Sequence, residues 1–159
     1  MPLDRRQFLK SSAAATVASL SALTAAGAAD KPNEKLVLAI MGVKGKDNGG
    51  IYAFTVKRRD PIMQDGMLLT PVGPMGVATG INFQPTGGGK AAITGDFVMV
   101  AEEVNPVIKA LRENGIEVTA LHSHMLNEQP RLFFMHFWAN DDALKLARGL
   151  RAALDKTAS

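Results

Sequence analysis

The 159-residue sequence contains no cysteine, so no disulfide can hold the fold together and no thiol can carry a lipid anchor. A long hydrophobic run is also absent. The apolar stretch at residues 11–25 is short and rich in Ser and Ala, and it could not span the roughly 30 Å of a bilayer core. The absences exclude a lipoprotein and an uncleaved membrane anchor, and they leave packing as the source of stability.

What the N-terminus does contain is a targeting pattern. Residues 4–10 read DRRQFLK and match the twin-arginine motif R-R-x-F-L-K, and Ala26-Gly27-Ala28 offers the small residues that a signal peptidase accepts. We therefore expect residues 1–29 to be a twin-arginine signal peptide. The remaining chain is predicted to be periplasmic or secreted, with no stable membrane anchor after cleavage.

The chain has almost no net charge once the signal peptide is set aside. The whole chain has 18 basic and 15 acidic residues, and removing Asp4, Arg5, Arg6 and Lys10 leaves 15 and 14. A nearly neutral protein lacks the basic surface that nucleic-acid binding requires, so we expect no nucleic-acid partner. Residues 30–159 show no repeat and no shift in composition, which predicts a single domain.

The most informative stretch is residues 115–140, which hold all three histidines and the only tryptophan. Residues 116–125 alternate in a strand pattern that places Ile116, Val118, Ala120, His122 and His124 on one face. A turn-like segment at residues 127–130 and an aromatic run at 131–139 then predict a β-hairpin. If its loop centres near Gln129, position 136 returns beside position 122, although a slip of one residue would turn His136 to the opposite face.

Three imidazoles on one hairpin suit a divalent metal ion, most readily zinc, with a fourth position left open. The predicted ligands are His122, His124 and His136, with Glu128 or Asp96 as an additional carboxylate. If the site is catalytic, metal-assisted hydrolysis is the expected chemistry, and Glu128, Glu102 and Glu103 are the candidate general bases. The complete H-E-x-x-H zinc signature is absent. Histidines that share a face with Ile116 and Val118 could equally be structural, each bonded to a backbone carbonyl.

The rest of the sequence indicates further strands and two helices. Residues 36–41 fit either a strand or a short helix, Asp65-Gly66 predicts a hairpin turn, and strands are expected at 50–56, 76–84 and 91–100. Residues 101–114 have a helical stripe, with Pro106 suggesting an irregular first turn or a helix that begins only at residues 105–106. We expect Asn140 to cap a second helix and residues 156–159 to fray.

This order predicts an α+β domain with a mainly antiparallel sheet and two helices on one face. From residue 91 the elements run βαββα, which is partly ferredoxin-like and lacks a closing strand that an earlier segment could supply. The apolar run at 131–139 should lie inside the sheet. The face without helices is then free for a pocket or for a second copy of the chain in a homo-oligomer.

Residues 101–155 also resemble the bacterial LppY/LpqO family. The most specific segments are EVNPVIKAL, IEVTALHSHM and EQPRLFFMHFWA, and looser similarity extends upstream through DGMLLTP. The resemblance implies an exported protein whose domain, residues 30–159, has no settled biochemical role. Some relatives carry a lipid-modified cysteine and many have two related domains, and this chain departs from both patterns.

Two functions from different classes remain. The first is a metal-binding exported protein, and a metal-assisted hydrolase is its catalytic form. The second is a non-enzymatic periplasmic module with structural histidines and no cofactor, whose aromatic hairpin binds a small-molecule or envelope ligand. The sequence does not decide whether the protein is an enzyme.

Overall fold

A computed structural model describes residues 33–159, so the predicted signal peptide lies outside the described residues. The described part of the chain begins and ends with a helix, and a third helix separates two groups of strands. In order they are α1 (Glu34–Met41), β1 (Gly45–Asp47), β2 (Tyr52–Val56), β3 (Ile62–Gln64), β4 (Met67–Leu69), the 3₁₀ turn η1 (Gly73–Met75), β5 (Thr79–Gly87), β6 (Lys90–Met99), α2 (Ala101–Glu113), β7 (Glu117–His122), β8 (Phe133–Asp142) and α3 (Ala143–Leu154).

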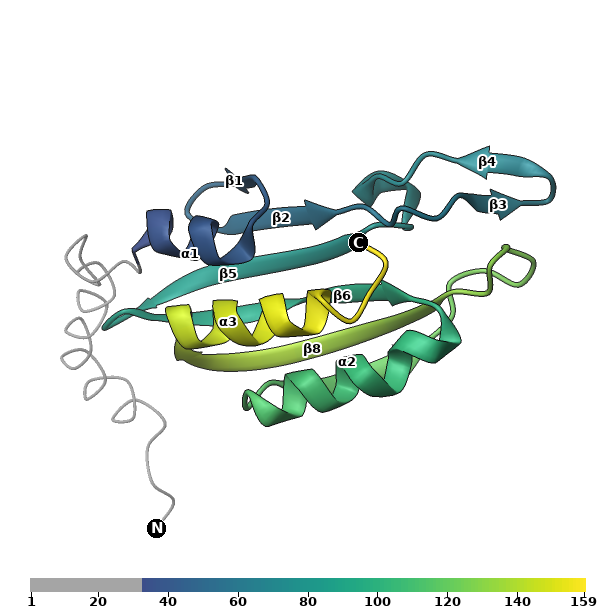
Figure 1. The fold of residues 1–159 in the computed structure, drawn as a ribbon. Coiled ribbons are helices and arrows are strands. Elements are labelled where there is room, and N and C mark those ends of the chain that lie inside the picture. The colour runs from purple at the N-terminus through teal and green to yellow at the C-terminus, as the bar shows by residue number, and fades with distance from the viewer. Residues whose placement is uncertain (1–32) are drawn as a thin grey trace, which may run out of the picture.

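Six strands form one sheet in the order β1-β2-β5-β6-β8-β7, and all neighbouring strands are antiparallel. Strands β6 and β7 are joined by α2 and are both antiparallel to β8, which lies between them. This is the split βαβ arrangement that the sequence predicted. The missing closing strand is supplied by β5, which pairs with β6 on its other side (Figure 1). The α+β class is thus confirmed, with β8 inside the sheet as expected.

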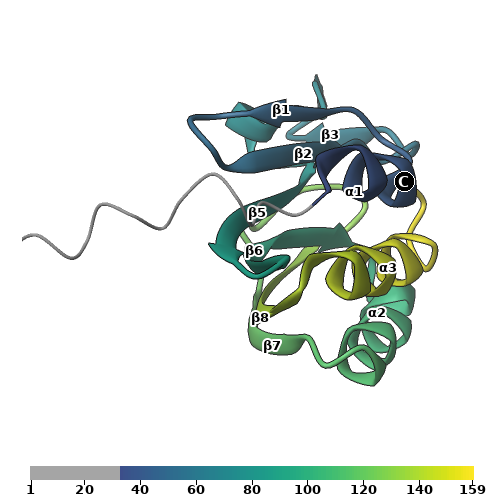
Figure 2. The ribbon, with the colours of Figure 1, turned by 90° about the vertical axis from the view of Figure 1, so that its left-hand side faces the viewer.

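The helices all cover the same face of the sheet (Figure 2). Three helices do so rather than two, because residues 34–41 form a helix and not a strand. The Asn33 side chain accepts a hydrogen bond from the Leu36 amide at its start, and Gly42 ends it in the left-handed conformation. Beneath the helices lies the main core, built around Phe54, Phe83, Phe97 and Phe137. Among residues 33–159, no helix is both long and apolar enough to cross a membrane.

A second, smaller core lies at one end of the other face. It consists of Ile62, Val77, Val98, Leu132 and Phe134, which come from the sheet and from segments near the β3–β4 hairpin. That hairpin turns at Asp65-Gly66, as predicted. It projects from the end of the sheet beside the loop that joins β7 to β8 (Figure 1), and an isolated bridge between Met63 and Gln129 connects the two. The remainder of this face carries no helix among the described residues.

Helix α2 begins at Ala101 and runs through Pro106 without interruption, so the expected irregular start was wrong. Pro106 has no backbone donor to give to the helix, but the start of the helix is held by a different contact. The Glu103 carboxylate accepts a hydrogen bond from the Val100 amide at 2.9 Å. This contact resembles the return half of a capping box.

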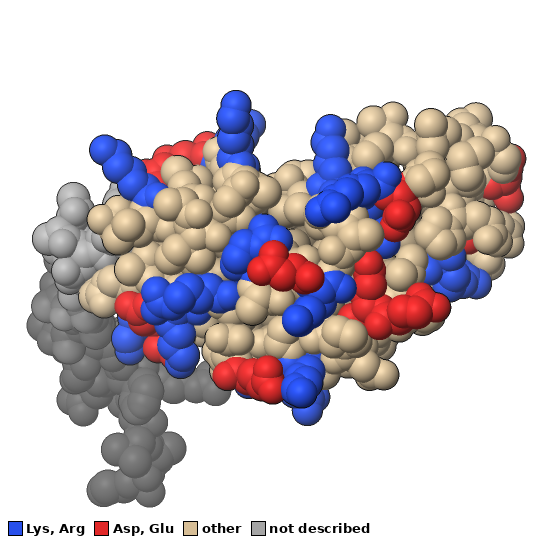
Figure 3. Space-filling model, in the orientation of Figure 1, with Lys and Arg blue, Asp and Glu red and all other residues tan. Residues whose placement is uncertain are grey.

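Two predictions about the C-terminal helix were also wrong. Strand β8 continues to Asp142, and Asp142 rather than Asn140 caps α3 by accepting from the Lys145 amide. Residues 156–159 do not fray, because the Arg59 amide donates to the Ala158 carbonyl at 2.8 Å and the Ala158 amide donates to Glu103 at 2.7 Å. The helix-covered face carries acidic and basic side chains side by side (Figure 3).

Candidate metal centre

A β-bulge in β7 decides which way the histidines point. Val118 pairs with Phe137, but the next paired residue is Ala120, opposite His136, so Thr119 is an extra residue in the strand. Before the bulge, Ile116 and Val118 pack into the main core beneath the helices. After it, alternation resumes on the opposite face. The prediction that Ile116 and Val118 share a face with His122 was therefore wrong. The argument that these histidines are core residues depended on that shared face, so it no longer holds.

The register of the β7–β8 ribbon also differs from the prediction. His122 pairs with Phe134, and His136 pairs with Ala120, so the ribbon centres on residue 128 rather than near Gln129. The difference amounts to two residues along β8. Because side chains alternate with a period of two, a shift of two residues preserves the face, and His136 stays on the same side of the sheet as His122.

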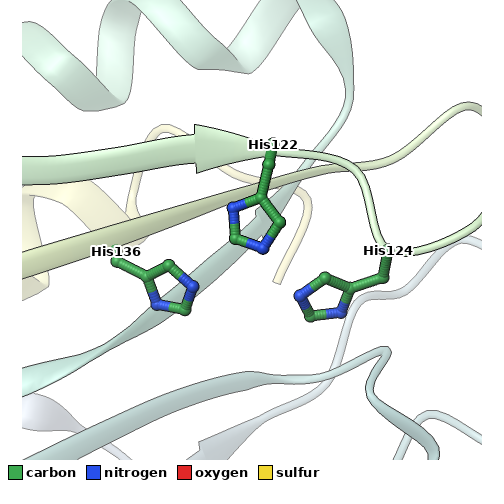
Figure 4. Close-up of side chains that lie close together, drawn as sticks. All are labelled: His122, His124 and His136. Atoms are coloured by element: carbon green, nitrogen blue, oxygen red, sulfur yellow. The ribbon is translucent and has the colours of Figure 1, made fainter.

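The three imidazoles come together at the end of this ribbon (Figure 4). His122 is the last residue of β7, His136 lies within β8, and His124 follows two residues after β7 ends. One nitrogen from each ring falls within 4.8 Å of the other two. The ring centroids of His122 and His136 are 4.9 Å apart, and those of His122 and His124 are 5.0 Å apart. A tetrahedral zinc ion with nitrogens at about 2.0–2.1 Å holds them roughly 3.3 Å apart, so the rings would close by on the order of 1 Å.

A backbone carbonyl on the neighbouring strand, β6, fixes the orientation of the His136 ring. Its Nδ1 atom lies 3.2 Å from the Gly95 carbonyl oxygen. A carbonyl can only accept, so a hydrogen bond here requires the proton on Nδ1, and in a neutral ring with that proton the free lone pair is on Nε2. A backbone carbonyl that orients a histidine in this way is typical of metal sites.

His124 is held by stacking rather than by a strand. Its ring centroid lies 3.5 Å from that of Phe134, with 12° between the ring planes, and Phe134 is fully buried in the second core. The loop that carries His124 is closed by a hydrogen bond from Ser123 Oγ to the Leu132 carbonyl at 3.0 Å. The two most exposed imidazoles are His122 and His124, while His136 is half-buried. The cluster is therefore open to solvent and to a ligand.

Comparison with known proteins places the chain in a family. Residues 35–156 match the family described as Domain of Unknown Function (DUF1259). The chain belongs to this family. The match begins in α1 and ends just after α3, so the DUF1259 domain includes the whole sheet and the histidine cluster. No curated protein and no solved structure matches the chain.

The start of the chain matches a second pattern. Residues 2–22 match the signal sequence of the twin-arginine translocation pathway. The DUF1259 domain is thus exported by the twin-arginine route, as its first residues predicted. This route carries folded proteins, so a cofactor could be taken up before export.

The carboxylates proposed as general bases do not join the histidines. Within the described part of the DUF1259 domain, the one group of potential ligands whose donor atoms come together is the histidine trio. Glu128 is buried and accepts hydrogen bonds from the Leu132 amide at 3.0 Å and from Arg131, so it organises the loop. Glu103 pairs with Arg58, and Glu102 is exposed in the first turn of α2.

Asp96 has a different position. It pairs with His136 across β6 and β8, so its side chain leaves the sheet on the same face and next to that histidine. Its oxygens lie outside the group of donors within 4.8 Å of one another. Asp96 is the predicted carboxylate that the strand register brings beside the cluster.

Proposed function

We propose that this exported domain binds one divalent metal ion, zinc by the nature of its donors, through His122, His124 and His136. The observation that carries the proposal is the approach of three imidazole nitrogens to within 4.8 Å of one another on an accessible face. Three neutral nitrogen ligands with an open fourth position are the donor set of a reactive zinc site. A purely structural role for the histidines would not require them to converge.

The surroundings of the rings support this function. His136 is oriented by the Gly95 carbonyl and His124 by Phe134, so two of the three ligands have a partner that fixes the ring. Such supporting contacts reduce the freedom that each ligand loses on binding. The β-bulge at Thr119 also supports a functional site, because bulges next to such sites re-aim side chains.

The proposal extends from metal binding to catalysis. A zinc ion with an open position acts as a Lewis acid toward an oxygen-containing ligand, which is the basis of metal-assisted hydrolysis. The residues of this chain would hold the ion and keep one side open to substrate. Asp96, beside His136, is the carboxylate best placed to accept a proton. Binding of the ion is thus the primary proposal, and hydrolysis depends on it.

We also propose that the chain is related to the LppY/LpqO family. The resembling segment, residues 101–155, contains β7, the loop and β8, and therefore the entire histidine ribbon. If the kinship holds, the other members should present the same three donors.

The decisive experiment is elemental analysis of untagged protein after incubation with zinc and gel filtration, since a polyhistidine tag would bind metal itself. We expect one zinc per chain in the wild type and a loss of affinity in His122→Ala, His124→Ala and His136→Ala. That loss should exceed the roughly 10- to 100-fold typical of removing a supporting partner. Glu102→Ala is the matched control, because this exposed residue on α2 does not contribute to the cluster.

Folding of each variant is checked by circular dichroism and thermal unfolding. A wild-type protein that takes up no zinc, or folded histidine variants that bind it as the wild type does, would overturn the proposal. The histidines would then be structural, as in the second hypothesis drawn from the sequence.

A further inference from the structure

The face of the sheet opposite the helices contains a shallow groove beyond the histidines. Its volume is about 350 Å³, and its lining includes Asn48, Ile51, Asn82, Gln84, Thr94 and Trp138. Three of these come from one row across the sheet, because Asn82 pairs with Thr94 and Thr94 pairs with Trp138. Their neighbours along each strand point into the main core, so the polar side chains of the row stand on the open face.

The chemistry of the groove is neutral but rich in hydrogen-bonding groups. The residues that line it, all within the described part of the chain, include no charged side chain. Three are amides, and each amide offers both donors and an acceptor, while the Thr94 hydroxyl can do either. Beside them Trp138 is 47% exposed. Such an indole is a flat apolar surface, and its paired neighbour on the other side, away from Thr94, is Glu117 of β7.

These features favour one class of ligand. A fatty chain would leave the amides without partners when it displaced their water, which is unfavourable. An anion would find no cation in the lining. A sugar ring matches both parts, since its C–H face can lie against the indole while its hydroxyl groups donate to and accept from the amides.

We propose that this groove binds a neutral saccharide, with its ring stacked on Trp138 and its hydroxyl groups hydrogen-bonded to Asn82, Gln84 and Thr94. Binding does not involve the histidines, so the proposal stands apart from the metal site. The two sites nevertheless share β8. His136 lies two residues from Trp138 on the same face, a distance of about 7 Å along a strand.

The connection between the two sites rests on the proposed metal function. The row next to the groove consists of Gly80, Asp96 and His136, so it already includes one of the proposed ligands. Gly80 has no side chain, and a Cβ there would already lie 3.2 Å from the Asp96 carboxylate. The Asp96 carboxylate therefore lies over Gly80, and a saccharide longer than one ring that extends from Trp138 toward the histidines would meet this carboxylate first.

Trp138 makes the test direct, because it is the only tryptophan in the chain. The probes are cellotetraose, maltotetraose and N-acetylchitotetraose, titrated while tryptophan fluorescence is recorded. We expect at least one of them to give a saturable change in intensity and emission maximum. Calorimetry with the same probe should show roughly a tenfold or greater loss of affinity in Trp138→Ala and a smaller loss, about 3- to 10-fold, in Asn82→Ala.

Leu121→Ala is the matched control, since Leu121 is 45% exposed but pairs with Met135 on the helix side of the ribbon. It should bind the probe as the wild type does. The His122→Ala protein should also retain binding, which separates this inference from the metal proposal. Absence of binding for all three probes at about 10 mM, well above the roughly millimolar Kd of a weak complex, or an unchanged affinity in folded Trp138→Ala, would overturn the inference. Binding of octanoate in their place would identify an apolar site and would equally overturn it.

Discussion

His124 and Phe134 lie face to face, with ring centroids 3.5 Å apart and ring planes inclined by 12°. His124 is in a loop, so this stacking is what ties its ring to the sheet. The same aromatic ring also fills the second core. Phe134 thus connects the stability of that core to the position of a predicted ligand.

Replacing Phe134 by Leu should weaken zinc binding by roughly 10- to 100-fold, because His124 loses the surface that orients it. Competition with a zinc-binding dye would measure the change. The control is Phe137→Leu, which alters an equally buried ring on the other face of the same strand. It should lower the free energy of unfolding to a similar extent and leave zinc affinity unchanged. Equal losses of affinity in both variants would contradict the role given to Phe134.

A second prediction concerns Gly95, whose carbonyl orients His136. A Cβ at position 95 would lie 2.0 Å from the Gly80 carbonyl oxygen on β5, so Gly95→Ala must separate two paired strands. Overpacking of this kind costs about 1–3 kcal/mol or more. Urea unfolding would measure it, and Gly73→Ala serves as the control because nothing lies within 4 Å of the place that its added Cβ would occupy. A Gly95→Ala protein as stable as the wild type would show that the strands do not approach so closely.

The third prediction tests the bulge. Deleting Thr119 removes the extra residue and leaves a regular ladder in which His122 still pairs with Phe134, so zinc binding should persist. Deleting both Thr119 and Ala120 moves His122 opposite Met135 and onto the helix face. Zinc affinity should then fall to the level of His122→Ala. Elemental analysis of the two deletion variants distinguishes these results, and loss of the ion in both would mean that the bulge has another role.

A fourth prediction concerns Arg58, whose side chain is fully buried between Asp60 and Glu103. It also donates to the Val98 carbonyl at 3.1 Å. Burial lowers the pKa of Arg58, but hydrogen bonds from its guanidinium to Glu103 and Asp60 outweigh burial and raise it. Arg58→Ala leaves Glu103 without its cation and should cost about 3–5 kcal/mol in denaturant unfolding.

Lys57→Ala is the control for Arg58→Ala, because Lys57 is the preceding residue in the sequence and its side chain is exposed. Its change in the free energy of unfolding should stay within about 0.5 kcal/mol. If Arg58→Ala were as mild as this control, the buried ion pair would contribute little net stability.

Much of the fold could be predicted because its signals are local and repeated. The apolar stripes of α2 and α3 and the turn at Asp65-Gly66 are determined by neighbours in sequence. Residues 36–41 remained open between strand and helix, since a short apolar run has no distinct period. The caps at Asn33 and Asp142 depend on single side-chain contacts, which many polar residues could make.

The histidines show where prediction from sequence ends. Their residue type and their place in one ribbon indicated a site, and the structure brings all three together. The face on which they lie could not be predicted, because one extra residue at Thr119 reverses the alternation and no residue type marks it. A pocket on the face without helices was expected, but the polar row that lines the groove around Trp138 was not identified, since it is assembled from β5, β6 and β8, which are distant in sequence.

The three histidines fall within positions 122 to 136, whereas the pairing of Asp96 with His136 joins residues forty positions apart. Closing a short loop loses less chain entropy than closing a long one. An ion bound early would therefore hold this ribbon together before it paired with β6, its one neighbour in the described sheet. In a protein that must finish folding before it leaves the cytoplasm, zinc would then act as an assembly factor as well as a cofactor.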